Sequence, residues 1–290
     1  MDATGTFHEW QLDSLAGATL NAQLEGDDAA YASVAQPTRV GNYTQISRKA
    51  LTISGTMEAV KKAGRKSEVA RQLMKQMREF KRDVEQALIG NQASTAGGQA
   101  SARLSGGMEA WIASTDHGGN GIRATSTCAC STIGFSTGVV AAPTDGSSTS
   151  SITTSNLNNT LTEAWTDGGN PGIIITGAGV RAQIDALTSV ATRFVDVDDA
   201  AGGKNLPILT SAGVYVSDFG RHTLILSRYV RSTQCLVIDP EYWAQAWLRR
   251  PTVQTLAATG DGEKRMIIGE YCLVARNPNS SGKIQGLTSP

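Results

Sequence analysis

The sequence predicts an α+β protein whose first domain is discontinuous along the chain. Three observations support this fold class: a long amphipathic helix at 67–90, strands of two-residue periodicity at 39–57 and 265–276, and a strand–helix pair between 170 and 190. Strand 265–276 has no evident partner near it in the sequence. We therefore expect it to return and pair with the early strand, on the far side of a compact α/β unit at 157–262.

The first 66 residues are expected to form a long hairpin. Residues 39–57 alternate apolar and polar positions, and residues 6–13 are the natural antiparallel partner. A wide tip at about 20–38 contains the acidic, small-residue stretch EGDDAAYASVAQP. The strand carries few apolar side chains, so we expect it to be half exposed or to pair with something outside its own domain.

Residues 67–90 carry the clearest helical pattern. Apolar residues recur every three to four positions, at Val69, Ala70, Leu73, Met74, Met77, Phe80, Val84, Ala87 and Leu88. Ser67 is a suitable N-cap and Gly90 a suitable stop. At about 1.5 Å per residue the helix would be roughly 35 Å long. That is well beyond the usual length of about three turns.

The other side of this helix and the segment before it are basic. The candidate cations are Lys62, Arg65, Arg71, Lys75, Arg78 and Arg82. A solvated face with an i,i+4 pair such as Lys75–Glu79 explains the pattern, and so does non-specific contact with a phosphate backbone. No aromatic residues are interleaved for base stacking and no known DNA-binding motif is present. The pattern alone leaves both interpretations open.

After residue 118 the sequence predicts a low-complexity stretch followed by a series of helices and strands. Residues 118–156 are dominated by Gly, Ser, Thr and Ala, and we expect a loosely ordered surface excursion. A helix at 157–168, a buried strand at 170–177 and a second helix at 180–190 follow. Strands are predicted at VYVSDF, HTLILS and QCLVID, a helix-like turn at PEYWAQAWLR, a long strand at 265–276 and a last short strand near the end.

Bulk composition excludes several classes of protein. Lys plus Arg equals Asp plus Glu at 26 each, so attraction of the whole molecule to nucleic acid is not expected. No apolar run is long enough to span a membrane, and no secretory signal is present. The four cysteines lack the spacing of redox or zinc motifs, so we expect free thiols.

No pattern of catalytic or metal-binding residues is complete. The chain has three histidines and no G-x-S-x-G nucleophile motif. DVDDAAGG at 196–203 lacks the bidentate Glu of a calcium loop, which favours a solvated acidic loop. GAGVRAQ at 177–183 lacks the remaining residues of a phosphate loop, which favours a helix-packing turn. We therefore predict no enzymatic activity and no cofactor.

Eight segments spread over nearly the whole chain carry a family resemblance. They are HEWQLDSL (8–15), NYTQISRK (42–49), SGTMEAVKKAGR (54–65), MKQMREFKRDVEQALIGN (74–91), ARLSGGMEAWI (102–112), VYVSDFG (214–220), VIDPEYWAQAWLR (237–249) and TGDGEKRMIIGEYCLVARN (259–277). Together they resemble the SU-ten-like family of tailed-phage major capsid proteins.

The resemblance implies the Hong Kong 97-type capsid fold. In that fold an extended hairpin, the E-loop, lies over a neighbouring subunit. A long spine helix and a long-stranded sheet form the peripheral domain, and a compact α/β axial domain lies at the capsomer centre. The implied domains are an N-terminal segment with the E-loop hairpin 5–60 (1–66), the peripheral domain with spine helix 67–90 (67–156), the axial domain (157–262) and a return strand (263–290).

The resemblance also implies partners and a location. A capsid subunit would assemble with itself into hexamers and pentamers, contact neighbouring capsomers and enclose double-stranded DNA. Portal, scaffolding and decoration proteins are further implied partners. The protein would be found in the virion after assembly in the host cytoplasm. The basic side of the helix would face DNA, axial contacts would lie around 196–204, and the E-loop contacts would involve Glu25, Asp27, Asp28 and Tyr31.

Two alternatives remain at this stage. A non-viral nanocompartment shell would share the fold, and a hydrolase or nucleotide-binding enzyme is disfavoured by the missing motifs. The chain also departs from the family in two places. Only seven residues precede His8, where family members usually carry an N-terminal arm, and the excursion at 118–156 is unusually long.

Overall fold

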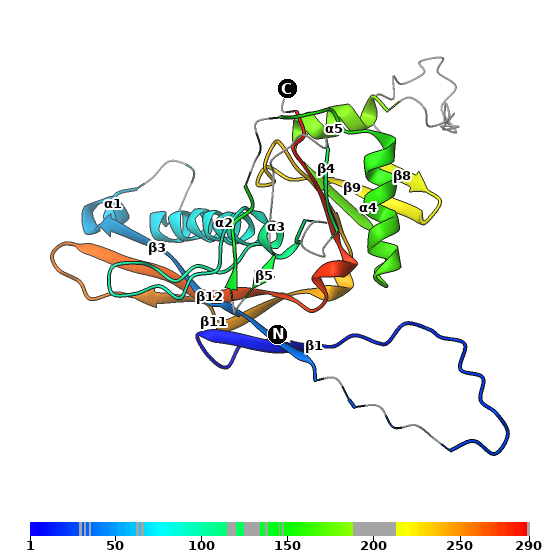
Figure 1. Ribbon diagram of the computed structural model, residues 1–290. Coiled ribbons are helices and arrows are strands. Elements are labelled where there is room, and N and C mark those ends of the chain that lie inside the picture. Colours follow the sequence, from blue (N-terminus) through cyan, green and yellow to red (C-terminus); the bar gives the residue numbers. More distant parts are fainter. Residues whose placement is uncertain are drawn as a thin grey trace, which may run out of the picture.

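The computed structural model describes most of the chain, and two bodies are evident in it (Figure 1). In one body, a long helix lies along one face of a three-stranded sheet, and a two-stranded hairpin leaves from the other face. The second body is a six-stranded sheet with two helices. The described residues are 1–28, 31, 33–34, 36–61, 64, 67–114, 120–124, 134–136, 139–144, 146, 148–187 and 213–288.

The three-stranded sheet is built around β12 (Gly262–Ala275), which pairs antiparallel on both sides. One partner is β3 (Gln45–Ser54), which lies more than 200 positions earlier in the sequence, as predicted for the returning strand. The other partner is β11 (Trp243–Thr255), which immediately precedes β12. The returning strand was expected to lack a local partner, and β11 corrects that expectation.

Helix α2 (Glu68–Ile89) matches the predicted helix at both ends. The Ser67 hydroxyl accepts a hydrogen bond from the Ala70 N–H, and Gly90 follows the last turn. Gly90 has an ordinary negative φ of −71°, so it is not needed for a left-handed turn. A Cβ there would lie 2.6 Å from the Gln86 carbonyl oxygen, and this steric limit explains the glycine.

The apolar stripe of α2 packs on the three-stranded sheet. Phe80, Val84 and Ala87 contact Ile267 and Tyr271 of β12. Nearer the start of the helix, Val69 packs against Leu51 and Ile53 of β3. Burying a large apolar side chain contributes about 1.5–3 kcal/mol. This seam therefore anchors the helix far more strongly than helix propensity could.

The six-stranded sheet has the order β4-β13-β10-β7-β9-β8. Its strands are β4 (Gly121–Arg123), β13 (Gly282–Gln285), β10 (Cys235–Ile238), β7 (Ile173–Thr176), β9 (Gly220–Leu226) and β8 (Val214–Ser217). Strands β4 and β13 lie outside the α/β unit predicted at 157–262, yet both belong to this sheet. The unit therefore extends beyond both predicted boundaries.

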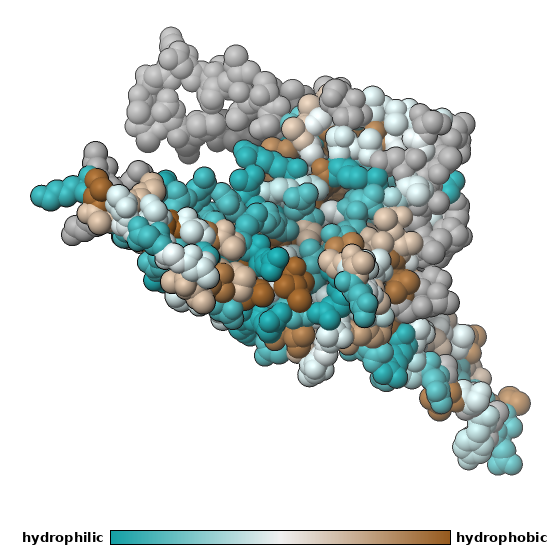
Figure 2. Space-filling view, turned by 90° about the vertical axis from the view of Figure 1, so that its left-hand side faces the viewer, coloured by the Kyte–Doolittle hydropathy of each residue, from teal (hydrophilic) through white to brown (hydrophobic). Residues whose placement is uncertain are grey.

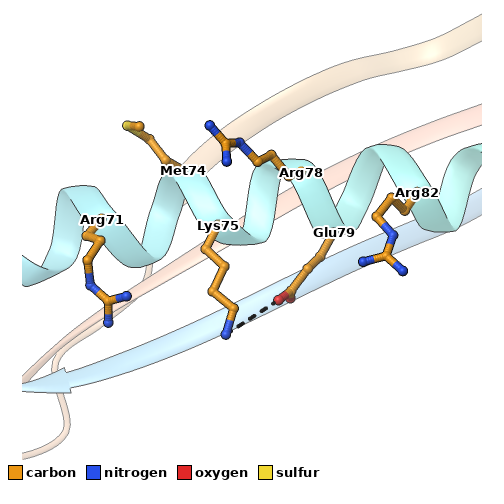
Figure 3. Close-up of a pocket in the computed structure, with 6 residues that line it drawn as sticks. All are labelled: Arg71, Met74, Lys75, Arg78, Glu79 and Arg82. Carbon is orange, nitrogen blue, oxygen red and sulfur yellow. Dashed lines mark ion pairs between the residues drawn. The ribbon is translucent and has the colours of Figure 1, made fainter. Parts of the chain in front are cut away.

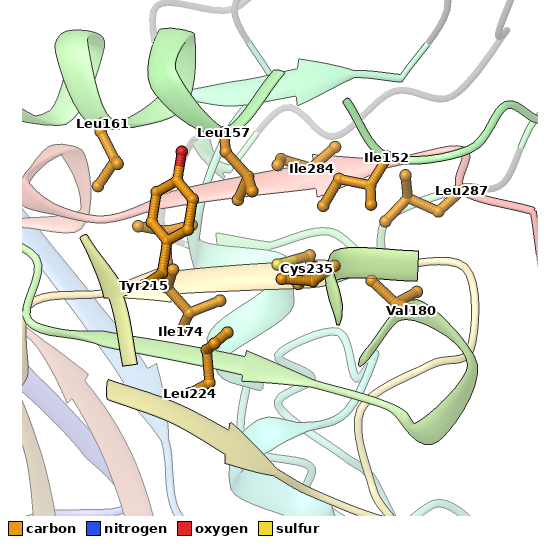
Figure 4. Packing of buried hydrophobic residues seen from close by; sticks show 12 residues of the cluster. Ile152, Leu157, Leu161, Ile174, Val180, Tyr215, Leu224, Cys235, Ile284 and Leu287 are labelled. Atoms are coloured by element: carbon orange, nitrogen blue, oxygen red, sulfur yellow. The ribbon is translucent and has the colours of Figure 1, made fainter. Parts of the chain in front are cut away.

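Helices α4 (Thr154–Thr166) and α5 (Ala178–Asp185) supply one layer of the core of this unit (Figure 4). Leu157 and Leu161 of α4 point at the sheet. Three sheet residues that meet the helices are fully buried, namely Ile174, Cys235 and Ile284. Because Ile284 belongs to β13, the end of the chain completes this core.

The remaining elements are short. They are α1 (Gly55–Ala59), α3 (Met108–Trp111), β5 (Phe135–Ser136), β6 (Val139–Val140) and two 3-10 turns, η2 (Pro240–Tyr242) and η3 (Pro278–Ser280). The hairpin consists of β1 (Phe7–Leu12) and β2 (Thr38–Tyr43).

Three predictions about elements were wrong. The strand at 39–57 is divided into β2 and β3, which enter different sheets. The segment PEYWAQAWLR was predicted as a helix-like turn, but only Pro240–Tyr242 forms one. From Trp243 the chain is a strand that pairs with β12. The 118–156 excursion is not wholly superficial, because Val140 is 1% and Ile152 3% exposed, although much of the segment lies outside the described residues.

The two bodies are joined through a buried group of charges. Glu109 of α3 is 1% exposed, and its carboxylate accepts a hydrogen bond of 2.6 Å from the Arg231 Nε. The Nζ of Lys283, a fully buried residue of β13, donates to the Glu109 carbonyl oxygen at 3.0 Å. Breaking such a pair by removing one partner typically costs about 3–5 kcal/mol. The charges therefore hold the joint in one arrangement.

Asn42 of β2 attaches the hairpin to the rest of the protein. It is fully buried, and its Nδ2 donates to the Leu273 carbonyl oxygen at 2.8 Å. Its Oδ1 accepts from the Gly106 N–H at 2.8 Å and from the Ser94 hydroxyl at 2.9 Å. One amide thus connects the hairpin, the loop after α2 and strand β12.

We expect Asn42→Ala to lower the free energy of unfolding by roughly 2–4 kcal/mol. At least two buried groups lose their partner, at about 1–3 kcal/mol each. Urea denaturation of the unassembled protein measures the change, and Asn21→Ala in the exposed part of the hairpin is the matched control. A loss below about 0.5 kcal/mol for Asn42→Ala would contradict this role.

Candidate assembly and nucleic-acid surfaces

The first candidate surface is the outer side of α2. Figure 3 shows a shallow hollow there, lined by Arg71, Met74, Lys75, Arg78, Glu79 and Arg82. All six side chains come from this one helix. Its four cations and one carboxylate give the hollow a formal charge of +3. Such a surface attracts anions without offering an enclosed pocket.

Two of the four cations are committed to partners in the same chain. The Arg71 Nε donates to Oε1 of Glu68 at 3.1 Å, and the Glu68 side chain is fully buried. The Arg82 Nε donates to the Tyr229 hydroxyl at 2.8 Å. These hydrogen bonds raise the pKa of both guanidinium groups. Arg71 therefore neutralises a buried carboxylate, and Arg82 connects α2 to the second body.

The other two cations of the hollow, Lys75 and Arg78, are not bound to a buried group or to the second body. Lys75 lies 3.8 Å from Glu79 in the predicted i,i+4 pair, and its side chain is 64% exposed. Arg78 is exposed and projects with Met74 on a different side of the helix from Lys75 (Figure 3). Lys62 and Arg65 of the predicted set lie outside the described residues. The available positive charge thus centres on Lys75 and Arg78.

The second candidate surface is the hairpin loop between β1 and β2. Its large apolar side chains have almost no contact with their own chain: Leu15 is 99%, Leu20 97% and Tyr31 97% exposed. The predicted contact residues Glu25, Asp27 and Asp28 are exposed in the same loop. Figure 2 shows this loop protruding at the lower end of the molecule, with apolar residues along it. Such exposure is typical of a surface that a partner covers.

A third feature was not predicted. Glu270 of β12 is 3% exposed and is shared by Arg103, whose Nη2 lies 2.6 Å from Oε1, and Arg249, whose Nε donates to Oε2 at 3.0 Å. The Thr44 hydroxyl donates to the same carboxylate at 2.7 Å. No local pattern connects these positions, so only the folded chain could reveal them. The axial candidates at 196–204 lie outside the described residues.

Histidine and cysteine side chains have structural contacts where they are described. The His222 Nδ1 lies 2.6 Å from the Pro171 carbonyl oxygen, so it donates, and Nε2 accepts from the Ser217 hydroxyl at 2.7 Å. A carbonyl stands where a catalytic triad would need a carboxylate. Cys235 and Cys272 are free and buried, and burial raises the pKa of both thiols to about 12. Both thiols therefore stay protonated at neutral pH.

The described residues contain neither a metal-binding cluster nor a membrane-spanning helix. No group of three or more His, Cys, Asp and Glu side chains in that part of the chain is arranged to hold a metal ion. None of the described helices is long and apolar enough to cross a membrane.

Comparison with known proteins gives a family and a fold. The family model of the SU10 major capsid protein matches residues 1–288. A relative, the major capsid protein of Escherichia phage Phieco32, is 26% identical over 305 residues, covering 96% of this chain and 84% of the relative.

Solved structures share the fold at low sequence identity. The capsid asymmetric unit of Cyanophage A-1(L) has a TM-score of 0.64 at 14% identity, covering 99% of this chain and 90% of the other. The holo-SrpI encapsulin complex from Synechococcus elongatus PCC 7942 has a TM-score of 0.57 at 9% identity, covering 100% and 85%. The fold is therefore common to phage capsids and an encapsulin.

Arg71 is bound to a buried carboxylate and Arg78 is exposed, so the two arginines should differ in their contribution to the stability of the subunit. Arg71→Ala is expected to lower the urea midpoint of unfolding, because a fully buried Glu68 carboxylate loses its guanidinium partner. Arg78→Ala removes an exposed arginine seven residues further along the same helix, and it is expected to leave the urea midpoint unchanged. Equal midpoints for the two variants would show that the Arg71–Glu68 pair is not structural.

Proposed function

The chain belongs to the SU10 major capsid protein family of tailed phages, and we propose that its copies assemble into hexamers and pentamers that close an icosahedral shell around double-stranded DNA. The observation that carries this proposal is the match of the family model to residues 1–288. The role is structural rather than enzymatic, and the protein's place is the virion. Assembly in the host cytoplasm is part of the same proposal.

The elements correspond to the parts of such a subunit. The β1–β2 hairpin with its exposed loop would be the E-loop, and α2 the spine helix. The sheet β11-β12-β3 would form the peripheral domain with α2. The six-stranded sheet with α4 and α5 would form the axial domain, which then includes β4 and β13 beyond 157–262. Neighbouring capsomers and portal, scaffolding and decoration proteins are further proposed partners.

The nanocompartment alternative rests on fold alone. The encapsulin structure shares the fold at 9% identity, and such a likeness carries no information about cargo. The family match and the phage relative favour the capsid instead. An enzyme of the hydrolase or nucleotide-binding class is the least supported alternative, since Ser217 and His222 close a turn rather than a triad.

The basic side of α2 is proposed to face the packaged DNA. A closed shell gives every subunit one inner and one outer face. The hairpin and α2 lie on opposite faces of the three-stranded sheet, so the E-loop and the basic surface would face opposite sides of the shell (Figure 1). Lys75 and Arg78 are the two cations of the hollow that are not bound to a buried carboxylate or to the second body, and they would make sequence-independent phosphate contacts.

Purified protein is expected to form shells, capsomers or tubes, visible by negative-stain electron microscopy and sedimentation. Apolar residues on the hairpin loop need a partner, and near-zero net charge does not oppose association. Monodisperse monomers at high concentration, under conditions where the protein remains folded, would count against the proposal.

Lys75→Glu with Arg78→Glu is expected to weaken binding of unassembled capsomers to double-stranded DNA. Each lost phosphate contact should reduce the slope of log affinity against log salt by about 0.9. Salt titration of a fluorescent duplex measures the slope. The matched control is Arg221→Glu with Arg276→Glu, two exposed arginines away from α2. Equal losses for both variants would mean that net charge matters and the α2 face does not.

A further inference from the structure

The segment between β9 and β10 reaches out of the second body and contacts the body built on α2. Three consecutive residues make these contacts. The Tyr229 hydroxyl accepts a hydrogen bond of 2.8 Å from the Arg82 Nε. Val230 is buried in the apolar cluster that the two bodies share, and the Arg231 Nε donates to the Glu109 carboxylate at 2.6 Å. We call these three consecutive residues the clasp.

The contacts of the clasp differ in their access to solvent. Val230 is 7% exposed, and Glu109, which binds Arg231, is 1% exposed. Arg82 is exposed and Tyr229 is half-buried, so their hydrogen bond lies at the surface of the joint. Dissolved anions can therefore reach this outer contact, whereas the inner two are shielded.

The charge of Arg82 is not balanced by a carboxylate. The acidic side chains whose charge acts on it are Asp83 and Glu79. Asp83 is paired with Lys49 at 2.6 Å, and Glu79 lies 3.8 Å from Lys75. Among the described residues Arg82 itself has a hydrogen bond to a neutral hydroxyl and no ion pair. A positive charge therefore remains at the joint.

Arg82 and Tyr229 also keep donors for a further partner. A guanidinium carries five N–H groups, and the printed sequence places no other hydrogen-bonding partner than Tyr229 on the Nε. In the part of the chain that the structure describes, the two Nη groups of Arg82 bind no other residue. The Tyr229 oxygen accepts from Arg82, so its own hydrogen can be donated elsewhere.

The two groups lie side by side and both can face an oxyanion. The Arg82 side chain extends from the end of the hollow on α2, on the same side of the helix as Lys75 (Figure 3). Arg78 on α2 and Arg228, which precedes Tyr229, are exposed. Guanidinium groups bind phosphate oxygens through several N–H donors at once, and a hydroxyl can add one more. A phosphate group fits this set of donors.

We propose that Arg82 and Tyr229 form a phosphate site across the joint, so that a bound phosphate group holds the two bodies together. The inference rests on the proposed function, in which α2 faces packaged DNA, and it adds that one backbone phosphate contacts both bodies. Both donors meet the phosphate only while the clasp is closed. Binding therefore favours the closed joint, and the closed joint favours binding to the same extent.

Tyr229→Phe removes the hydroxyl and leaves the charge unchanged. The affinity of the unassembled protein for a fluorescent DNA duplex is expected to fall about threefold to tenfold, the value of one hydrogen bond. The slope of log affinity against log salt should stay the same, because a neutral group releases no counterion. Arg82→Ala should lower the affinity and also reduce that slope by about 0.9.

The matched control for this titration is Tyr242→Phe, which changes another half-buried tyrosine outside the clasp. It is expected to bind the duplex as the wild type does. An affinity of Tyr229→Phe equal to or above that of Tyr242→Phe would overturn the phosphate site.

Hydrogen exchange measures the closing of the joint. Saturating inorganic phosphate and a short duplex are each expected to slow amide exchange at 227–234 in the unassembled wild type, and potassium chloride of equal ionic strength is not. The slowing should disappear in Tyr229→Phe. Slowing that persists in this variant, or that chloride reproduces, would overturn the inference.

The two probes also separate this inference from the proposed function. Slowing by inorganic phosphate without any duplex binding would overturn the DNA-facing role of α2 and support the phosphate site. Duplex binding through Lys75 and Arg78, with exchange at 227–234 unchanged by either probe, would support that role and overturn the site.

Discussion

Strand β12 is the element on which the rest of the structure depends. It carries backbone hydrogen bonds to β11 on one side and to β3 on the other, and its two faces contact different parts of the chain. Ile267 and Tyr271 receive α2, whereas Cys272 and Val274 receive the N-terminal hairpin. Because β3 and β12 are more than 200 residues apart, this pairing requires a large loop to close, and the entropy of that closure slows folding.

The polar interactions near β12 add hydrogen bonds and ion pairs to the apolar contacts between the hairpin and the sheet. Asn42 links the hairpin to β12, and Glu270 links Thr44, Arg103 and Arg249. Buried amides and carboxylates of this kind are costly unless every group has a partner. They therefore specify one orientation of the hairpin, whereas an apolar contact of similar area would tolerate several.

The two sides of the three-stranded sheet differ in chemistry. On the α2 side, Arg71 and Arg82 serve the fold, and Lys75 and Arg78 supply the surface charge. On the other side, Cys272 and Val274 of β12 pack against Trp10 and Ala3, and Ile46 and Arg48 of β3 are exposed.

The sequence by itself determined the elements whose periodicity is local: α2 with its cap, β8 to β10, the late strand β12 and the acidic hairpin tip. The family resemblance also rests on short local segments of the sequence. Tertiary structure alone decided that WAQAWLR is a strand, because pairing with β12 outweighs the helix preference of its Ala and Leu residues. It also brought β4 and β13 into the second sheet, assigned Arg71 to Glu68, and placed Arg103 and Arg249 around Glu270. Those results depend on contacts between distant residues, and no local pattern encodes them.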